Sequence, residues 1–256
     1  MGRLSGKVAI ITGGAGEIGK VTAEKFLAEG SKVVLVDLSA KALEKVKAEL
    51  SPNGEVLTIE ADVTKEADVA NYVKQVMGKY GQVDVFFNNA GIEGKVAPLV
   101  EQSVEDFDRV LAVNVRGVFL GLKYVLPVMM KQGSGSVINT SSVAGLHGSP
   151  NLSPYITSKH AVVGLTKAAA VEAAKAKVRV NSIHPSPVDT RMMRSIESGF
   201  SADHAEFIQE EFTKAIPLGR YAESADVASL ALFLASDESS FITGVQYRVD
   251  GGMGSR

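Results

Sequence analysis

Short apolar runs of strand type recur along the 256-residue chain and alternate with stretches of helical periodicity. The runs are rich in Val and Ile and lack the alternation of a half-exposed strand, as expected for strands covered on both faces. They cover residues 7–12, 32–37, 55–62, 84–88, 136–141, 179–184 and 245–249. The helical patterns cover residues 17–29, 40–50, 65–80, 103–130, 153–176 and 223–236. This strict succession predicts an α/β fold, a doubly wound parallel seven-stranded sheet with helices on both faces.

The pattern predicts a single domain over residues 1–256, because no Pro/Gly/Ser-rich linker or repeat divides the chain. Residues 185–216 lack regular periodicity, and a long insert in a compact domain is usually functional. We therefore expect a substrate lid there. Its apolar side chains predict either a mainly hydrophobic pocket or simple packing of the lid onto the body. They are Met192, Met193, Ile196, Phe200, Phe207 and Phe212.

Composition narrows the function classes. Charged residues make up 22% of the chain and nearly cancel, with a formal net charge of −2, so no basic stripe supports binding to nucleic acid or to a membrane. The lack of cysteine excludes disulfides and thiolate catalysis, and the four histidines have no metal-motif spacing, so no metal is expected. The N-terminal apolar run is too short for a signal peptide, and no run matches a membrane helix. We expect a cytoplasmic protein.

The stretch TGGAGEIG, residues 12–19, joins the first strand run to the first helical pattern. The amides at a helix N-terminus and the positive end of its dipole suit a pyrophosphate, and glycines let the backbone approach it. In this strand-to-helix position, the stretch predicts the dinucleotide site of a Rossmann-type fold rather than a bend without a ligand. The candidate contacts are Gly13, Gly16, Glu17, Ile18 and Gly19.

Asp37 ends the second strand run, where a carboxylate accepts both ribose hydroxyls of an adenosine. Such a carboxylate repels a 2′-phosphate, and the sequence Asp37-Leu38-Ser39 offers no Arg or Lys to bind one. The predicted cofactor is therefore NAD rather than NADP, with Asp37 and Leu38 as contacts. The alternative is that Asp37 only caps the helix predicted over residues 40–50.

Polar residues also follow the other strand runs. Because ligands bind outside the carboxyl ends of parallel strands, these residues predict one continuous groove, although each is also compatible with an ordinary turn. They are Asp62 with Val63, the NNAG stretch that includes Asn89, Ala90 and Gly91, Ser141 with Ser142, and His184 with Pro185.

Two helical patterns carry polar residues on apolar faces. Asn114 lies four residues before Val118, on the apolar face of 103–130, where an amide is either functional or a structural group bonded to backbone. Tyr155 and Lys159 are four residues apart and share a face. A neighbouring cation favours phenolate, which brings a tyrosine toward the operating pH of a general acid/base. Alone, however, Tyr-x-x-x-Lys is more often an exposed pair.

As a set, these motifs resemble the short-chain dehydrogenase/reductase (SDR) family, in its branch of single-domain chains of roughly 250 residues. The resemblance covers essentially the whole sequence, from TGGAGEIG through YITSK at 155–159 to ITGVQYRVDGG at 242–252. It implies an oxidoreductase that transfers a hydride between NAD(H) and a secondary alcohol or ketone. The hydride chemistry belongs to the cofactor, and the protein supplies placement and electrostatics.

The same resemblance implies the roles of individual residues. Tyr155 is the general acid/base, Ser142 binds the substrate oxygen, and Lys159 lowers the pKa of the phenol and binds the nicotinamide ribose. Asn114 holds a water that links Lys159 to solvent. The implied cofactor contacts are Asp62 and Val63 at the adenine, Asn89, Ala90 and Gly91 along the adenosine ribose and cofactor spine, and Val188 and Thr190 at the carboxamide and diphosphate.

Two positions depart from the family pattern. The family turn reads T-G-x-x-x-G-x-G, but position 17 is glutamate here and Gly16 precedes it. Glu17 suits the dipole of the helix that it begins, yet it repels a pyrophosphate unless it points to solvent, so we expect modest cofactor affinity. Ser186 stands where the family commonly has glycine, and with Pro187 it stiffens the entry to the lid.

Two other functions stay open at this point. One is an NADPH-dependent ketoreductase acting on 3-oxoacyl thioesters, which Asp37 disfavours; the other is a non-catalytic dinucleotide-sensing protein, which intact Ser142, Tyr155 and Lys159 disfavour. The Ala- and Gly-rich helix over 153–176 and the apolar face of 103–130 indicate helix pairing across a twofold axis. The family commonly forms tetramers in this way, so we expect a homotetramer.

Overall fold

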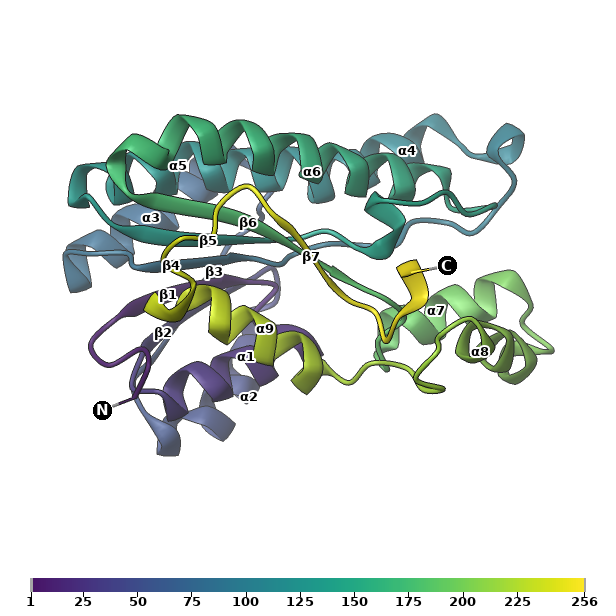
Figure 1. The fold of residues 1–256 in the computed structure, drawn as a ribbon, viewed down its shortest axis with the longest axis horizontal. Coiled ribbons are helices and arrows are strands. Elements are labelled where there is room, and N and C mark those ends of the chain that lie inside the picture. The colour runs from purple at the N-terminus through teal and green to yellow at the C-terminus, as the bar shows by residue number, and fades with distance from the viewer. Residues whose placement is uncertain (1, 256) are drawn as a thin grey trace.

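A computed structural model describes residues 2–255 and shows one seven-stranded sheet between two layers of helices (Figure 1). The strand order is β3-β2-β1-β4-β5-β6-β7, and every neighbouring pair is parallel. The strands are β1 (Val8–Thr12), β2 (Lys32–Asp37), β3 (Val56–Glu60), β4 (Val85–Asn88), β5 (Gly135–Thr140), β6 (Val178–Pro185) and β7 (Gln246–Val249). The predicted doubly wound parallel sheet is confirmed.

The helices also follow the predicted succession, with two differences described below. They are α1 (Glu17–Ala28), α2 (Ala40–Leu50), α3 (Glu66–Tyr80), α4 (Val104–Leu111), α5 (Gly117–Gln132), α6 (Ser153–Ala173), α7 (Arg191–Phe200), α8 (Ala205–Lys214) and α9 (Ser224–Ala235). In Figure 1, α3, α5 and α6 lie on one side of the sheet, and α1, α2 and α9 lie on the other.

Alternate residues of each central strand pack on opposite helix layers. In β1, Val8 and Ile10 belong to the core under α3, α5 and α6, whereas Ala9 and Ile11 belong to the core under α1, α2 and α9. All five β1 residues are buried. Burial on both faces explains why these runs read as continuously apolar instead of alternating.

The sheet has its switch point between β1 and β4. From β1 the chain moves outward to β2 and β3, and then returns to β4 on the opposite side of β1. The connections on the two sides of this point run in opposite directions, which leaves a crevice outside the carboxyl ends of the strands. The glycine turn after β1 and the NNAG stretch after β4 therefore lie next to each other.

The helix predicted over residues 103–130 is not one regular α-helix. A π-helical turn, Ala112–Arg116, separates α4 from α5. The wide turn contains the fully buried Asn114, whose side chain accepts from the backbone amide of Ile92 and donates to its carbonyl, both at 2.8 Å. π-Turns are uncommon and are frequent at functional sites. In this π-turn, the physical cause is the Asn114 side chain, which bonds to the backbone of Ile92 in another segment.

The helical run Val104–Gln132 is also long and apolar enough, by those two measures alone, to cross a membrane. The same measures are met by core helices of globular proteins. Here Val118, Val125 and Met129 pack in the core against the sheet.

The segment predicted as an irregular lid folds into two helices. β6 continues to Pro185, and α7 and α8 follow beyond the carboxyl edge of the sheet (Figure 1). α7 is strongly amphipathic: Met193 and Ile196 are buried with Leu152 and Tyr221 in a small third core. α7 is only ten residues long, which is too short for its helical periodicity to stand out in the sequence pattern.

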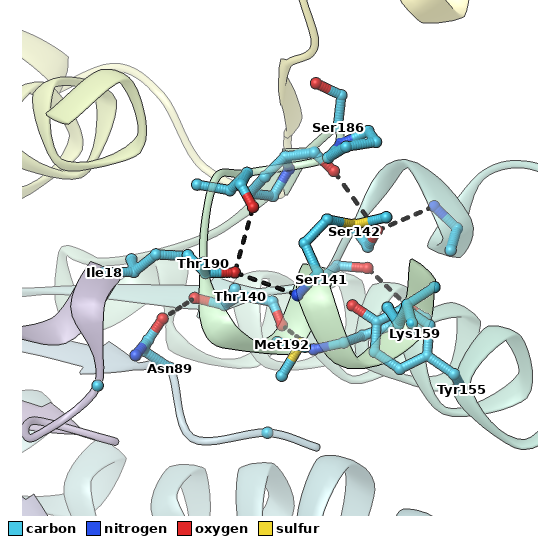
Figure 2. A pocket seen from close by; sticks show the side chains of 18 of the residues that line it. Ile18, Asn89, Thr140, Ser141, Ser142, Tyr155, Lys159, Ser186, Thr190 and Met192 are labelled. Carbon is cyan, nitrogen blue, oxygen red and sulfur yellow. Dashed lines mark hydrogen bonds between the residues drawn. The ribbon is translucent and has the colours of Figure 1, made fainter. Parts of the chain in front are cut away.

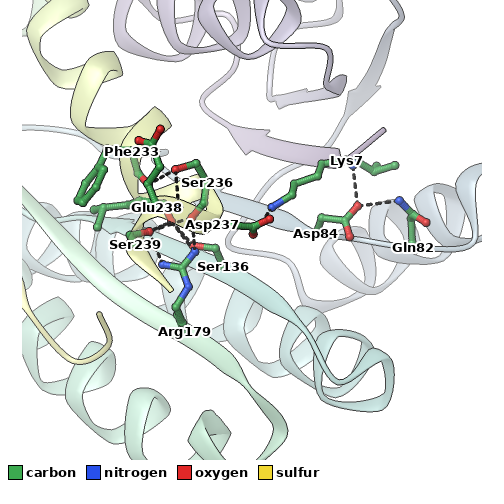
Figure 3. A network of polar contacts seen from close by, with 12 residues as sticks. Lys7, Gln82, Asp84, Ser136, Arg179, Phe233, Ser236, Asp237, Glu238 and Ser239 are labelled. Carbon is green, nitrogen blue, oxygen red and sulfur yellow. Dashed lines mark hydrogen bonds and ion pairs between the residues drawn. The ribbon is translucent and has the colours of Figure 1, made fainter. Parts of the chain in front are cut away.

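At the opposite edge of the sheet, the guanidinium of Arg179 binds the end of α9 (Figure 3). It donates to the carbonyl oxygens of Leu234 (2.9 Å) and Ser236 (3.0 Å) and to Ser239 Oγ (2.7 Å). The last carbonyls of a helix have no partner within the helix, so Arg179 on β6 caps α9 against the sheet. Nearby, Lys7 forms an ion pair with Asp237 at 2.6 Å, but the Asp237 side chain is 87% exposed.

We expect Arg179→Met to lower the free energy of unfolding by about 2–4 kcal/mol, because three buried acceptors lose a charged donor. The control Lys7→Met breaks the exposed pair and is expected to cost less than about 1 kcal/mol. Urea unfolding of both variants measures the difference. Equal losses in the two variants would contradict the capping role of Arg179.

Candidate active site

A cavity of about 650 Å³ opens at the carboxyl ends of β1, β4, β5 and β6, between α1 and α7. Most of the predicted site residues line it: Gly13, Gly16, Glu17, Ile18, Gly19, Asp37, Asn89, Ala90, Gly91, Ser142, Tyr155, Lys159, Val188 and Thr190. Leu38, Asp62, Val63 and Asn114 are not among its lining residues. The structure thus brings residues from six separate stretches of the sequence to one space.

The glycine turn needs two of its glycines for steric reasons. Gly13 has φ of +64°, and a Cβ there would lie 3.1 Å from the Ala90 Cα. A Cβ on Gly19 would lie 2.3 Å from the Gly13 carbonyl oxygen, closer than atoms can approach. The predicted roles of Gly13 in the turn and Gly19 in close packing are consistent with these contacts.

Asp37 is hydrogen-bonded to the glycine turn and lines the cavity. Its Oδ2 accepts from the Ala15 amide at 3.0 Å. The helix α2 is capped by Ser39, whose hydroxyl accepts from the Ala42 amide at 3.2 Å. The alternative that Asp37 is only the cap of this helix is therefore wrong. Leu38, by contrast, is 67% exposed and lies outside the cavity lining, so its contact with the cofactor stays a prediction.

Asp62 and Val63 have structural contacts in the turn between β3 and α3. Asp62 Oδ1 accepts from the amide (2.9 Å) and the hydroxyl (2.7 Å) of Thr64. The Val63 side chain faces Gly117, where a Cβ would lie 3.0 Å from it. Their contact with an adenine stays a prediction.

The hydroxyl of Thr12, at the end of β1, fixes the start of the NNAG loop. It accepts from the amides of Asn89 (2.9 Å) and Ala90 (3.1 Å). The Asn89 side chain donates to the Thr12 carbonyl and accepts from the Thr140 hydroxyl, both at 3.2 Å. Thr12 begins the TGGAGEIG stretch, but no role for its hydroxyl followed from the sequence; the structure shows that it positions the NNAG loop.

Tyr155 and Lys159 lie in the first two turns of α6 and line the cavity together, as their spacing predicts. Figure 2 shows them on one side of the cavity, with Ile18 and Thr190 on the other. Lys159 is 4% exposed; its Nζ donates to the Thr140 carbonyl at 3.0 Å and lies 5.4 Å from the centre of the Tyr155 ring. The alternative of an exposed surface pair is wrong.

Burial dominates the electrostatics of this pair. It raises the pKa of Tyr155 to about 12, with the Ser142 hydroxyl lowering it and the Glu93 carboxylate raising it further. Burial also lowers the pKa of Lys159 to about 8. The expected lowering of the phenol pKa by Lys159 is not seen in this structure, because burial outweighs the lowering by the Ser142 hydroxyl.

The backbone carbonyl of Ser142 is hydrogen-bonded to the His184 ring. The Ser142 hydroxyl accepts from the Ala144 amide at 3.2 Å and donates to the Pro185 carbonyl at 3.4 Å. His184 Nδ1 lies 2.8 Å from the Ser142 carbonyl oxygen and must donate to it, so Nε2 accepts from the Ser182 hydroxyl at 2.8 Å. Burial lowers the pKa of His184 to about 4, which keeps the ring neutral. The sequence marked His184 only as a polar strand end.

Asn114 has more partners in the chain than its implied role requires. Besides the two bonds to Ile92, its Nδ2 donates to the Ser158 hydroxyl at 3.0 Å. It is also near Lys159, since a Cβ on Gly91 would lie 3.3 Å from Asn114 Oδ1 and 3.4 Å from Lys159 Nζ. The structure therefore supports the structural alternative, and the role in binding a water stays a prediction.

The two departures from the family pattern have different surroundings. Glu17 is exposed at the first turn of α1, and both of its carboxylate oxygens accept from the backbone amide of Arg191, at 3.1 and 3.2 Å. Ser186 is 6% exposed, and its Oγ has no hydrogen-bond partner among the described residues. The link between Glu17 and α7 was not predicted.

The far end of the cavity is mainly apolar. Of the lid side chains singled out in the sequence, Met192, Met193, Ile196 and Phe212 line it. Phe200 instead packs edge-on against Phe212, with ring centres 5.7 Å apart, and Phe207 is 57% exposed. Leu152 and Met253 also line this end and were missed, since nothing in the local sequence connects them with the lid.

The residues and their arrangement match a known family. A family model described as enoyl-(acyl carrier protein) reductase matches residues 13–254. Levodione reductase from Leifsonia aquatica is 43% identical over 253 residues, which cover 98% of this chain and 95% of that protein. The chain belongs to the short-chain dehydrogenase/reductase family.

Other SDR relatives are similar over their whole length. Cyclohexanol dehydrogenase from Acinetobacter sp. (strain SE19) is 38% identical, covering 99% of this chain and 97% of that protein. The 3-oxoacyl-[acyl-carrier-protein] reductase FabG from Thermotoga maritima is 41% identical, covering 98% and 99%.

Solved SDR structures superpose closely on this fold. The crystal structure of levodione reductase has a TM-score of 0.96 at 42% identity, covering 98% of this chain and 99% of that chain. NAD⁺-bound xylitol dehydrogenase has a TM-score of 0.93 at 35% identity, covering 97% and 99%.

The low pKa of His184 leads to a prediction about acid stability. Between its ordinary value of 6.5 and about 4, the unfolded chain binds the proton that the folded chain excludes. The free energy of unfolding should therefore fall as the pH drops through this window, by at most about 1.4 kcal/mol per pH unit for this group. We expect His184→Gln to flatten this fall in urea unfolding measured between pH 7 and 4.5.

The matched control is His204→Gln, which removes an exposed histidine and should leave the wild-type pH dependence unchanged. If His184→Gln retained the full acid dependence, the buried neutral ring would not be its source.

Proposed function

We propose that the protein transfers a hydride between NAD(H) and a compact, mainly apolar secondary alcohol or ketone, with Tyr155 as the general acid/base. The oxidoreductase class follows from membership of the SDR family. The observation that carries the proposal is the position of Ser142, Tyr155 and Lys159 on one wall of a cavity that reaches the glycine turn and Asp37.

The residues of this cavity fit a dinucleotide. In the turn after β1, Gly19 lies too close to the Gly13 carbonyl for a side chain, and Gly13 has the positive φ that favours glycine. The turn also exposes the uncapped N-terminus of α1. Asp37 lies where a carboxylate binds the ribose hydroxyls. NAD bound here would supply the hydride chemistry. The residues that would hold the cofactor are Gly13, Gly16, Ile18, Gly19, Asn89, Ala90, Gly91, Val188 and Thr190, with Leu38, Asp62 and Val63 as outer contacts.

Side chains of the protein transfer the proton that accompanies the hydride. With its pKa raised to about 12, the Tyr155 hydroxyl is protonated at neutral pH and can donate to the oxygen of a ketone. Ser142 binds the same oxygen by a hydrogen bond. Lys159, whose pKa is lowered to about 8, is still an ammonium at neutral pH and stabilises negative charge that develops on the phenol oxygen.

The apolar end of the cavity supports the substrate class. Its walls are hydrophobic side chains of α7, α8 and the C-terminal segment, which include Met193, Ile196, Phe212 and Met253. Such a pocket binds a small carbon skeleton without charged groups. The names of two relatives, cyclohexanol dehydrogenase and levodione reductase, agree with a substrate of this kind.

The NADPH-dependent reduction of 3-oxoacyl thioesters is the second candidate, and the FabG relative supports it. Asp37 disfavours a 2′-phosphate by charge, since Asp37-Leu38-Ser39 carries no compensating cation. Comparing NADH with NADPH in one reductase assay distinguishes the two. A binding protein without catalysis is disfavoured, because Ser142, Tyr155 and Lys159 are all present and lie together.

A screen for NAD⁺ reduction with cyclic, aromatic and aliphatic secondary alcohols tests the proposed activity. On the best substrate, we expect Tyr155→Phe to lower kcat by about 10²–10⁴-fold, the usual contribution of a general acid/base, and to leave the Kd of NADH nearly unchanged. The control Tyr124→Phe removes a hydroxyl that donates to Glu66 outside the cavity and should retain full activity. Unchanged turnover in Tyr155→Phe would overturn the mechanism.

We also propose that the protein is a cytoplasmic homotetramer. Leu99, Val100, Val104 and Phe119 are exposed by 48–88% in or near α4 and α5. A shallow hollow beside Phe119 continues to Leu165 on α6. Single exposed apolar side chains are normal, but a cluster over adjacent helices favours association. Light scattering at micromolar concentration should give four times the chain mass of 27.0 kDa, and a monomer would contradict the proposal.

A further inference from the structure

The carboxylate of Glu17 joins two helix N-termini on opposite sides of the cavity. Glu17 is the first residue of α1, and its oxygens accept from the amide of Arg191, the first residue of α7. Both residues line the cavity. The contact thus connects the nucleotide-binding turn directly with the lid.

We propose that Glu17 is a positioning residue that latches α7 across the cavity and is displaced when the diphosphate of the dinucleotide binds. The proposal rests on the NAD binding proposed above. It assigns a role to the residue that stands where the family turn has glycine.

On the α7 side, the contact uses the backbone amide of Arg191, which has no partner within the helix. The first amides of a helix have no partner within it. In α7, the Thr190 hydroxyl accepts from the Met193 amide at 3.4 Å, and Glu17 takes the Arg191 amide. The Arg191 guanidinium also lies 3.8 Å from the Glu93 carboxylate, on the Tyr155 side of the cavity. Arg191 is therefore held by two carboxylates, one at its amide and one at its guanidinium.

The remainder of α7 is fixed more firmly. Glu197, which is 2% exposed, accepts from the Tyr221 hydroxyl at 2.8 Å and pairs with Arg194 at 2.9 Å. Ile196 is buried beside them, and Met193 is a buried contact within the first turn. From Met193 onward, α7 is thus held by buried contacts, whereas its first residue has only solvent-exposed contacts, which makes the start of the first turn the part that opens most easily.

Competition with the cofactor follows from charge. The N-terminus of α1 has no side-chain cap, so its amides and dipole attract an anion in the cavity, as the N-terminus of α7 does. In this structure, the Glu17 carboxylate lies between these two positive helix ends. A diphosphate drawn to the same place would be close to a like charge, so its binding favours departure of Glu17.

Hydrogen exchange of the ligand-free protein tests the latch. We expect the first-turn amides of α7, residues 191–194, to exchange about threefold to tenfold faster in Glu17→Ala than in the wild type, with Glu17→Gln intermediate because its amide oxygen still accepts. Amides in the second half of α7 should not change. The control Glu24→Gln removes the same charge from an exposed position two turns along α1 and should have no effect.

Calorimetry with ADP-ribose and adenosine tests the displacement. If Glu17 competes with the diphosphate, Glu17→Gln should bind ADP-ribose about threefold to tenfold more tightly than both the wild type and Glu24→Gln, whereas adenosine should bind equally to all three. With ADP-ribose bound, the first turn of α7 should exchange at the same rate in the wild type and in Glu17→Gln.

Two results would overturn the proposal: unchanged exchange of α7 in Glu17→Ala, or ADP-ribose binding to Glu17→Gln that is no tighter than to the wild type. Failure of the proposed function is a separate result. A wild-type protein that binds neither NAD⁺ nor ADP-ribose would refute both the proposed cofactor and the displacement, while the exchange measurement would still decide whether Glu17 holds the lid.

Discussion

The reversal of strand order beside β1 is the constraint on which the site depends. It makes the connections on the two sides of β1 and β4 diverge, so that the carboxyl ends of these strands face a crevice instead of a covering helix. The Thr12 hydroxyl joins the two strand ends by accepting from the amides of Asn89 and Ala90. The glycine turn, the NNAG loop and the face of α6 that carries Tyr155 and Lys159 are brought together by this one feature of the topology.

The chemistry of the site comes from burial as much as from the identity of its residues. Lys159 and His184 are buried and Tyr155 is partly buried, and each pKa moves in the direction that favours the neutral form. The free energy of desolvation is offset only where a fixed partner exists, such as the Thr140 carbonyl for Lys159 and the Ser142 carbonyl for His184. These side chains therefore have fixed hydrogen-bond partners, Thr140 for Lys159 and Ser142 and Ser182 for His184.

The lid differs from this wall because it is held by contacts of unequal strength. A buried carboxylate–phenol bond and apolar packing fix the second half of α7, while an exposed carboxylate holds its first residue. An acidic residue in a glycine turn between a strand and a helix conflicts with the local rule for turns of this type that bind phosphate. The hydrogen bond from the Arg191 amide of α7 explains structurally why a carboxylate can stand here. Local conflicts of this kind are often found at functional sites.

The sequence by itself determined the parallel sheet, the glycine turn and the face shared by Tyr155 and Lys159, because each is encoded by residues close together in the chain: apolar runs, a strand-to-helix turn, and a four-residue helical spacing. It did not reveal the π-turn at Asn114, the support of Ser142 by His184, the Met253 contribution to the cavity, or the raised pKa of Tyr155. Only the tertiary structure decided these features and the bond between Glu17 and Arg191, 174 residues apart. The physical reason is that such contacts and the loss of water around them depend on the packing of the whole chain.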